Sequence, residues 1–470
     1  MPRSNERDLL QGPLMPMIIR FSLPLIVTNL LQVCYSAADM IVVGLSNVPG
    51  AIGAIGTTSS LVTLILNVFI GFSVGATVIT ARCLGARNQQ GTEKAVHTAL
   101  LTGAIFGVVG GIVGVAIARP VLTLMGNQGE VLRLSVLYAQ IYFAGSPFLS
   151  VANYAIAIFR AKGDTATPLY VLTASGVLNV GLNLFFVLVC GMSVEGVAIA
   201  TSISSAASML WLLLLLNRDK GWCKFTWKNL SLDKRAFMDI LRIGLPAGLQ
   251  GALFSLSNLL IQSAIIGINN QVCPGGSGII DGNSAALSLE NFPYMASNAV
   301  CQASITFTSQ HYGAGKFRRI GKVMQNCCLL TCLVILIFGG SLLLFQKPLI
   351  GLYVQEGLAV ETAQLRLQVL ISTYFFVALM EVCSGVLRGL DHSAASTVIV
   401  LLGSCAFRIV WLYTIFQLNP TLTTIYLSYP ISWILTTLVL FLFVQHYWRP
   451  LVRLEEAREA EQIAQAQENA

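Results

Sequence analysis

The chain has 470 residues, of which 55% are hydrophobic and only 10% are charged, and its formal net charge is +7. Soluble globular proteins carry about 25% charged residues, so this composition excludes an ordinary soluble domain and indicates a membrane protein. The positive charge requires no nucleic-acid partner, because a basic rim that faces anionic lipid headgroups accounts for it.

Twelve apolar stretches follow one another along the chain, and each is long enough to cross a bilayer. A hydrocarbon core about 30 Å thick needs about 20 mostly apolar residues per helix. We predict spans at roughly 15–45, 54–81, 95–118, 132–156, 167–190, 194–216, 237–268, 284–310, 323–345, 364–387, 395–417 and 423–446. The predicted fold is therefore an all-α membrane protein with twelve transmembrane helices.

The distribution of Lys and Arg between the predicted loops indicates the orientation. Of the 28 Lys and Arg residues, 23 fall on the side that holds both ends of the chain, and four fall on the opposite side: Arg119, Arg133, Lys347 and Arg366. Cytoplasmic loops carry an excess of Lys and Arg. We expect a multi-pass protein of the plasma membrane (the bacterial inner membrane), with a cytoplasmic N-terminus at 1–14 and a cytoplasmic tail at 447–470.

The two halves of the sequence resemble each other. Three pairs of stretches match at separations of 222 to 228 residues: "RFSLP" with "RIGLP", "GARNQQ" with "GAGKFR", and "FRAKGD" with "LRGLDH". We therefore predict two six-helix lobes, at 15–217 and 237–446, joined by a cytoplasmic linker at 218–236. Because six is even, both lobes begin on the same face of the membrane, as in transporters that are built from parallel repeats.

Asp39 is the only charged residue in the apolar stretch "NLLQVCYSAADMIVVG". Together with Asn29, Gln32 and Ser36 it forms a stripe about 80° wide on one helix, at about 100° per residue. A carboxylate in a span costs about 2.5–3.5 kcal/mol on insertion scales, and such groups face protein or a water-filled cavity. Asp39 can therefore take up and release a proton or bind a metal cation, or it can simply tie helices together by hydrogen bonds.

A second polar stripe lies in the fifth predicted span. Ser175, Asn179 and Asn183 are spaced four residues apart, so they share one helix face. The amides can accept a cation or a hydrogen bond, and they can also serve only to join helices.

The second half of the chain has Gln262 where the first half has Asp39, and it carries its own charges inside predicted spans. Glu381 and Arg408 both lie mid-span. They are expected to form an ion pair, or else Glu381 is a second carboxylate, like Asp39, that can bind a proton or a cation and so act as a coupling site. Glu290 lies near the outer end of its span and is expected to contact water. The four His residues fall near span ends, where a role at the membrane interface is expected rather than a proton relay.

Five motifs resemble those of the multidrug and toxic compound extrusion (MATE) family of cation-coupled antiporters, and the resemblance is to its DNA-damage-inducible-type branch. They are "DMIVVG", "GARNQQ", "FRAKGDTATP", "LNVGLNLFFV" and "VEGVAIAT". The resemblance covers about residues 12–448 and implies two six-helix lobes around a central cavity. It also implies the export of organic, often cationic, compounds in exchange for inward H⁺ or Na⁺.

Carried over residue by residue, the resemblance implies a cation-coupling site formed by Asp39, Asn179, Asn183, Thr201 and Tyr138. Asn183 departs from the family, because the matching motif usually carries an Asp at this place. An amide oxygen can still coordinate Na⁺, but it cannot carry a proton, which leaves Asp39 as the only titratable carboxylate of the site. Gln32, Ser36 and Gln262 are expected to line the substrate cavity.

The sequence also argues against other classes of function. It contains no P-loop, no H-E-x-x-H or G-x-S-x-G motif and no cluster of acidic residues of the D-D-x-x-D type. Its 11 Cys residues are scattered through apolar stretches and indicate neither a disulfide framework nor a zinc site. We therefore expect a monomeric antiporter that is not an enzyme and holds no cofactor and no permanent metal; a flippase for a lipid-linked or glycan substrate is the alternative.

Overall fold

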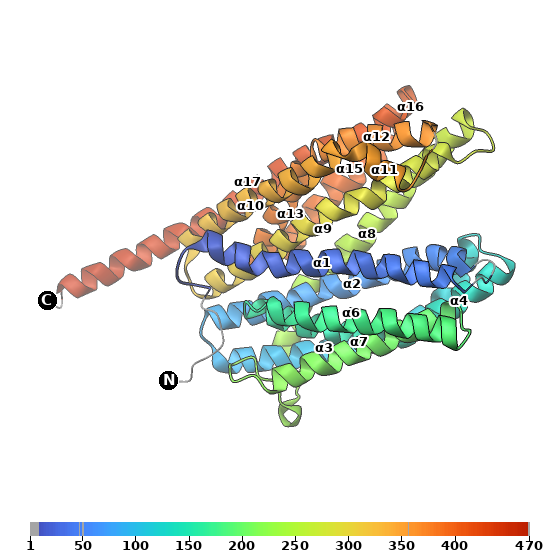
Figure 1. The fold of residues 1–470 in the computed structure, drawn as a ribbon. Helices are drawn as coiled ribbons and strands as arrows, with labels where there is room; N and C mark the ends of the chain where they lie inside the picture. Colours follow the sequence, from blue (N-terminus) through green and yellow to red (C-terminus); the bar gives the residue numbers. More distant parts are fainter. Residues whose placement is uncertain (1–8, 47, 49–50, 356, 469–470) are drawn as a thin grey trace. The chain divides into compact units, whose positions relative to one another are not determined.

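The computed structural model describes residues 9–46, 48, 51–355 and 357–468 (Figure 1). The predicted N-terminal segment at 1–14 and the predicted tail at 447–470 therefore lie partly outside the described residues. Within the described part the chain is almost entirely helical and contains no strand.

The chain as far as Val272, which includes the first helix of the second half, forms eight α-helices and two short helical segments of other types. They are α1 (Leu14–Gly44), α2 (Ala51–Gly85), α3 (Gln89–Leu124), α4 (Gly129–Ala144), α5 (Ser146–Ala161), α6 (Ala166–Leu184), the π-helix η1 (Phe185–Val189), α7 (Val194–Asn217), the 3₁₀-helix η2 (Trp227–Asn229) and α8 (Lys234–Val272).

The second half continues with nine α-helices and one further π-helix. They are α9 (Gly278–Gly313), α10 (Phe317–Leu344), α11 (Gln346–Gly351), α12 (Gly357–Ile371), α13 (Tyr374–Gly389), α14 (Ser393–Val400), the π-helix η3 (Leu401–Ala406), α15 (Phe407–Tyr413), α16 (Ile415–Leu418) and α17 (Leu422–Glu468).

Helices occupy all twelve predicted ranges. Nine helices of the described chain are long and apolar enough to span a membrane, and two bent pairs, α4 with α5 and α12 with α13, bring this number to eleven. The remaining range is occupied by α9, which does not meet the same hydropathy criterion. Its sequence is more polar, and it buries polar side chains such as Asn283 and Glu290 against protein.

The internal repeat is visible in the irregularities of the helices. The first helix of each half contains an internal proline, Pro24 in α1 and Pro246 in α8. The fourth span of each half is bent, by 49° between α4 and α5 and by 48° between α12 and α13. The fifth span of each half passes into a π-helix, η1 after α6 and η3 after α14. Such interruptions need neighbouring groups to satisfy the freed backbone, so their recurrence supports a true structural repeat.

Left-handed backbone positions recur in the same two motifs that matched in sequence. Arg87, with φ of 53°, matches Gly315, with φ of 69°, in the turns that follow α2 and α9. Gly163, with φ of 83°, matches Asp391, with φ of 76°, in the turns that precede α6 and α14. Each pair contains one glycine and one residue for which this conformation is uncommon.

The described residues form two compact units. The first contains Leu9 and residues 27–252, and the second contains residues 10–26 and 253–468. The N-terminal part of α1 thus belongs to the second unit, and the N-terminal part of α8 belongs to the first. These units differ at both helices from the lobes predicted at 15–217 and 237–446.

Small residues allow the helices of the first unit to approach closely. A Cβ atom on Gly107 of α3 would lie 2.6 Å from the Cα atom of Pro147, and one on Gly111 would lie 2.7 Å from the carbonyl oxygen of Phe143. The hydroxyl of Ser146 donates to the carbonyl of Gly107 at 2.9 Å across the same contact. Packing of this kind holds helices together in lipid, where the hydrophobic effect supplies no attraction between them.

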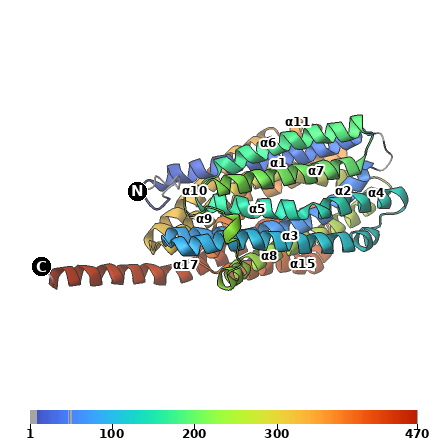
Figure 2. The same cartoon turned by 90° about the horizontal axis from the view of Figure 1, so that it is seen from below.

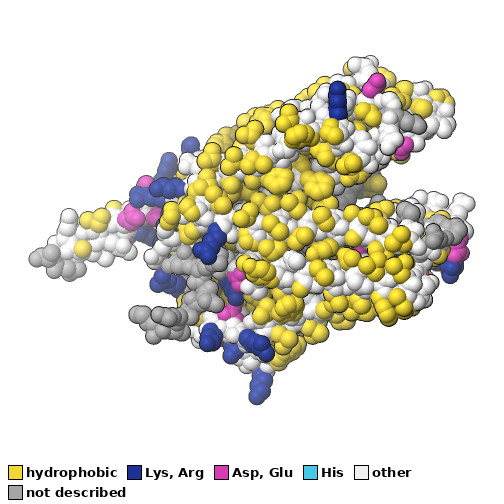
Figure 3. Space-filling view, viewed as in Figure 1, with side chains coloured by type: hydrophobic (Ala, Val, Ile, Leu, Met, Phe, Trp, Pro, Cys, Tyr) yellow, Lys and Arg dark blue, Asp and Glu magenta, His cyan; other side chains and the backbone are white. Residues whose placement is uncertain are grey.

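Apolar side chains cover the sides of the helices in each unit, and Lys and Arg gather towards helix ends (Figure 3). In the first unit, α6 and α7 lie side by side in both views (Figures 1 and 2). In the second unit, α17 continues as a single exposed helix through the charged tail.

The linker between the halves packs on the first unit. Phe225 is 2% exposed and lies 5.7 Å from the ring of His97, whose Nε2 accepts a hydrogen bond from the backbone N–H of Thr226. His97 is therefore a buried anchor for the linker rather than a residue of the membrane interface. Trp227, in contrast, is 61% exposed, as expected for an aromatic residue at an interface.

Candidate functional site

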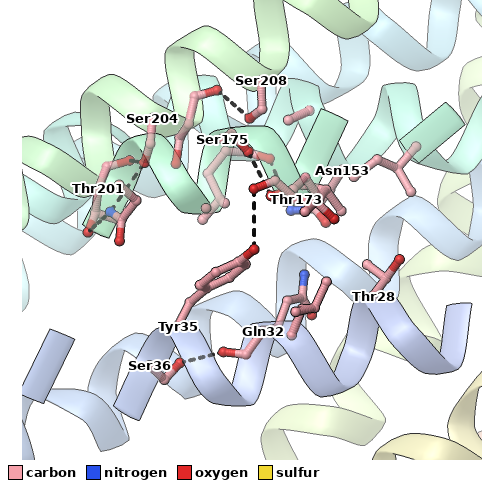
Figure 4. A pocket seen from close by; sticks show the side chains of 18 of the residues that line it. Thr28, Gln32, Tyr35, Ser36, Asn153, Thr173, Ser175, Thr201, Ser204 and Ser208 are labelled. Atoms are coloured by element: carbon pink, nitrogen blue, oxygen red, sulfur yellow. Dashed lines mark hydrogen bonds between the residues drawn. The ribbon is translucent and has the colours of Figure 1, made fainter. Parts of the chain in front are cut away.

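A polar cavity of about 200 Å³ lies within the first unit, between α1, α5, α6 and α7 (Figure 4). Hydroxyl, amide and carboxylate side chains make up much of its wall. The polar residues that line it are Thr28, Gln32, Tyr35, Ser36, Asp39, Asn153, Thr173, Ser175, Asn179, Thr201, Ser204, Ser205 and Ser208.

The stripe predicted on the first span is the α1 wall of this cavity. Gln32, Ser36 and Asp39 line the cavity as expected, but Asn29 does not. Thr28 and Tyr35, which the sequence analysis did not select, lie on the wall instead. Spacings of 28, 32, 35 and 39 fall on one helix face, so this signal was present in the periodicity but was obscured by the apolar ring of Tyr35.

Tyr35 reaches from α1 to α6 and so joins two walls of the cavity. Its hydroxyl donates to the backbone carbonyl of Thr173 at 3.3 Å (Figure 4). The ring lies directly over Gly176, where an added Cβ would come within 2.1 Å of the ring carbon Cζ. A glycine at 176 is therefore required for Tyr35 to reach this position.

Asp39 is connected to the polar stripe of the fifth span. The Nδ2 of Asn183 donates to Oδ1 of Asp39 at 2.5 Å and to Oδ1 of Asn179 at 3.2 Å. The Nδ2 of Asn179 in turn lies 3.3 Å from the hydroxyls of both Thr201 and Ser204 on α7. One hydrogen-bonded network therefore joins four of the residues that the resemblance placed in one site: Asp39, Asn179, Asn183 and Thr201.

This network has more acceptor atoms than donors. Asn183 is fully buried, and its Oδ1 has no hydrogen-bond partner. The second carboxylate oxygen of Asp39, Oδ2, receives no hydrogen bond from any residue that the structure describes. A buried acceptor without a donor is costly, and a proton or a metal cation would satisfy it.

Tyr138 lies apart from the cavity wall. It is 7% exposed, packs in the apolar core of the first unit and stacks on Tyr142 with ring centroids 6.1 Å apart. It interacts electrostatically with Asp39, but the described contacts include no hydrogen bond between the two residues. The structure therefore places Tyr138 behind the site rather than in its hydrogen-bonded network.

The second unit contains a closed ion pair that the sequence analysis did not predict. Nε and Nη2 of Arg366 donate to the two carboxylate oxygens of Glu290 at 2.7 and 2.8 Å, and Nη1 donates to Asn283 at 2.8 Å. The exposed fractions of the two charged side chains are 4% and 7%. The expectation that Glu290 contacts water was therefore wrong.

Gln262 belongs to the surroundings of this ion pair. Its Oε1 accepts a hydrogen bond of 2.9 Å from Asn283, which also contacts Arg366. This contact does not test the prediction that Gln262 lines a substrate cavity. It shows that the polar partner of Gln262 is Asn283, which itself contacts the buried ion pair.

Glu381 and Arg408 do not pair with each other in this structure. Arg408 donates from Nε to the hydroxyl of Ser432 at 3.0 Å and lies over the ring of Tyr429 at 4.1 Å. Glu381 contacts the thiol of Cys301 at 3.7 Å and interacts electrostatically with Arg388. The two residues project from different helices, and sequence periodicity cannot predict which neighbours such side chains meet.

Comparison with known proteins identifies the family. The MatE family model matches residues 24–185 and 246–414, which is more than half of the chain and covers both halves. The branch of the family is not distinguished by this match, so the resemblance to the DNA-damage-inducible type stays a prediction.

Several curated proteins are similar over most of their length. "Probable multidrug resistance protein YoeA" of Bacillus subtilis is 25% identical over 91% of this chain and 93% of that protein. "Multidrug export protein MepA" of Staphylococcus aureus is 21% identical over 83% of this chain and 85% of that protein.

Solved structures of MATE transporters share the fold. One that is described as the outward-facing conformation of a multidrug resistance MATE family transporter aligns with a TM-score of 0.87, over 96% of this chain and 99% of that chain, at 21% identity. A second, described as MATE in the bent conformation, aligns with a TM-score of 0.88. These matches confirm the all-helical, two-lobe membrane fold, and together with the family model they establish that the chain belongs to the MatE family, the multidrug and toxic compound extrusion (MATE) family.

Proposed function

We propose that this protein exports small organic compounds, cationic drug-like compounds among them, in exchange for inward flow of H⁺ or Na⁺. The observation that carries the proposal is the polar cavity of the first unit with Asp39 in its wall. The names of the curated relatives, which refer to multidrug resistance and multidrug export, support the substrate class.

Asp39 is proposed to bind the coupling cation. It is the one carboxylate among the lining residues. Its Oδ2 has no donor among the described residues, and neither has the neighbouring Oδ1 of Asn183. A proton on Asp39, or a Na⁺ ion shared between these oxygens, would satisfy the acceptors. Asn179 accepts a hydrogen bond from the amide of Asn183 and donates one to Thr201, so it holds the amide of Asn183 in place.

The same carboxylate is proposed to link the coupling cation to the substrate. A cationic compound in the cavity is stabilised by a charged Asp39 and loses that stabilisation once the carboxylate is neutralised. Cation entry therefore favours substrate release, and a shared site of this kind produces antiport through mutually exclusive binding.

The test is transport by the purified protein in proteoliposomes. An imposed pH gradient and, separately, an imposed Na⁺ gradient should drive the cationic dye rhodamine 6G in the direction opposite to the cation. The gradient that drives transport identifies the coupling ion. Transport of a fluorescent phospholipid, with no gradient-driven movement of the dye, would instead support a flippase.

The orientation of the chain is also a proposal. We infer that both termini and the linker at 218–236 face the cytoplasm, because Lys and Arg concentrate in these segments. A cysteine placed at Lys228, which is exposed, should be inaccessible to a membrane-impermeant maleimide in intact cells and accessible after permeabilisation. Ready labelling of intact cells would reverse the orientation.

A further inference from the structure

The second unit contains a buried cation that lacks an anionic partner. Arg408 is 2% exposed and lies in the middle of the span formed by α14, η3, α15 and α16. Its Nε donates to Ser432, but its Nη2 is buried and has no hydrogen-bond partner. Charged groups at such depths normally pair with an opposite charge or face a cavity.

No carboxylate of the described chain forms an ion pair with Arg408. Glu290 is already engaged by Arg366 through both of its oxygens. Glu381 is buried beside Cys301 and interacts electrostatically with Arg388 instead. Tyr429, Cys405 and Arg366 act electrostatically on Arg408, and the positive charge of Arg366 adds repulsion rather than compensation.

Aromatic rings surround the guanidinium group. Its Cζ atom lies 4.1 Å from the ring centroid of Tyr429, 5.7 Å from that of Trp433 and 6.0 Å from that of Phe254. The faces of these rings attract the cation but offer no acceptor for the free Nη2 proton. The same rings present flat apolar surface to any molecule that reaches the guanidinium.

We propose that Arg408 and Ser432 bind the anionic group of an organic substrate, a carboxylate or a sulfonate, with the aromatic rings packing on its apolar part. Arg suits such groups because its planar guanidinium matches two oxygens at once. Arg408 is buried in this structure, so the anion binds in a state in which the guanidinium group is accessible. This inference rests on the proposed export function and extends it to anionic and zwitterionic compounds.

Equilibrium binding of two charge-opposed dyes tests the proposal. The full chain in lipid nanodiscs is titrated with carboxyfluorescein, which is anionic, and with rhodamine 6G, which is cationic and shares the xanthene ring system. Fluorescence anisotropy reports the affinity without any ion gradient. Arg408→Gln should weaken carboxyfluorescein binding by about tenfold, which is about 1.4 kcal/mol, and should leave rhodamine 6G binding unchanged.

Two further variants keep the proposal falsifiable if Arg408→Gln does not fold. Arg408→Lys keeps the charge and should retain part of the affinity for the anionic dye. Ser432→Ala removes the acceptor of the hydrogen bond from Nε of Arg408. It should weaken binding of the anionic dye and leave binding of the cationic dye unchanged. Sodium sulfate serves as a competitor that carries the anionic group without an apolar part.

Several results would overturn the proposal. The first is that the wild-type protein does not bind carboxyfluorescein. The second is that the wild type and all three variants bind carboxyfluorescein equally well. The third is that sulfate binds as tightly as the dye. Loss of rhodamine 6G transport in Arg408→Gln that is restored by adding Glu381→Gln would make Arg408 a counterion of Glu381 instead. Failure of gradient-driven transport alone would contradict the proposed function and leave the binding result standing.

Discussion

The two units stabilise polar groups inside the membrane in opposite ways. The first unit places one carboxylate, Asp39, among amides and hydroxyls at the wall of a cavity. The second unit pairs Glu290 with Arg366 through two hydrogen bonds and buries both almost completely. The first arrangement leaves acceptor oxygens without donors, whereas the second gives both carboxylate oxygens a donor.

On the proposed function, this difference separates a site that binds a cation from an ion pair that only holds helices together. A buried pair with both oxygens and most donors satisfied holds helices together and gains nothing from a ligand. A half-buried carboxylate beside acceptors without donors gains from each proton or cation that arrives. Burial of a charge in a span is therefore a poor guide to function, and the count of unsatisfied partners is a better one.

Asp39→Asn should have the largest effect on transport. The amide keeps the size of the side chain but removes the negative charge, so gradient-driven export of rhodamine 6G in proteoliposomes should fall to background. Asp281→Asn, at an exposed position on α9, is the matched control and should transport at the wild-type rate. Wild-type export by Asp39→Asn would reduce Asp39 to a structural role and remove the contrast between the units.

Arg366→Gln and Arg408→Gln should differ in stability. Removing Arg366 leaves Glu290 buried and unpaired, which should lower the free energy of unfolding by about 3–5 kcal/mol. Arg408 pairs with no carboxylate of the described chain, so its removal leaves no charge unpaired. The free energy of unfolding should therefore fall by no more than about 1 kcal/mol. Thermal melting of the detergent-solubilised variants measures both. In a double-mutant cycle, Glu290→Gln should recover much of the loss caused by Arg366→Gln, and purely additive losses would contradict the ion pair.

Asn183→Asp should raise the affinity of the first unit for Na⁺. The new carboxylate would lie beside Asp39, where Asn183 now contacts its Oδ1. Two adjacent negative charges attract a cation more strongly, so Na⁺ should bind about tenfold more tightly in isothermal titration. Asn153→Asp on α5, in the same cavity, is the control for added charge alone. Unchanged Na⁺ affinity in Asn183→Asp would exclude Asn183 from the cation site.

Asp233→Asn should have the smallest effect and tests a carboxylate outside the spans. A hydrogen bond from the backbone N–H of Ala236 lowers the pKa of Asp233 below its ordinary value of 3.8, and Lys94 contributes to the same shift. Its contribution to the first turn of α8 is therefore present above about pH 4 and is lost as the pH falls below that value. Hydrogen exchange of the Ala236 amide should accelerate on acidification beyond its intrinsic rate change. The extra acceleration should be absent in Asp233→Asn.

Much of the architecture followed from periodicity and composition. The twelve apolar stretches, the repeat and the polar stripe on α1 are local properties, because the bilayer requires long apolar helices and forces polar residues onto one face. The matched turns at Arg87 and Gly315 were also visible as sequence motifs. The boundaries of the compact units were not, since Pro24 and Pro246 indicate irregular helices without indicating which unit each end contacts.

The sequence by itself determined that Asp39 needs a polar neighbour and that Asn179 and Asn183 share a face. Only the tertiary structure decided which polar groups meet. It joined Asp39 to Asn183, paired Glu290 with Arg366 rather than Glu381 with Arg408, and left Nη2 of Arg408 without a partner. The physical reason is that helix periodicity fixes the direction of a side chain around its own axis, whereas contacts between helices depend on how each helix is rotated, bent and packed. Helices such as α4 with α5 and α12 with α13, bent by 49° and 48°, change those contacts along their length.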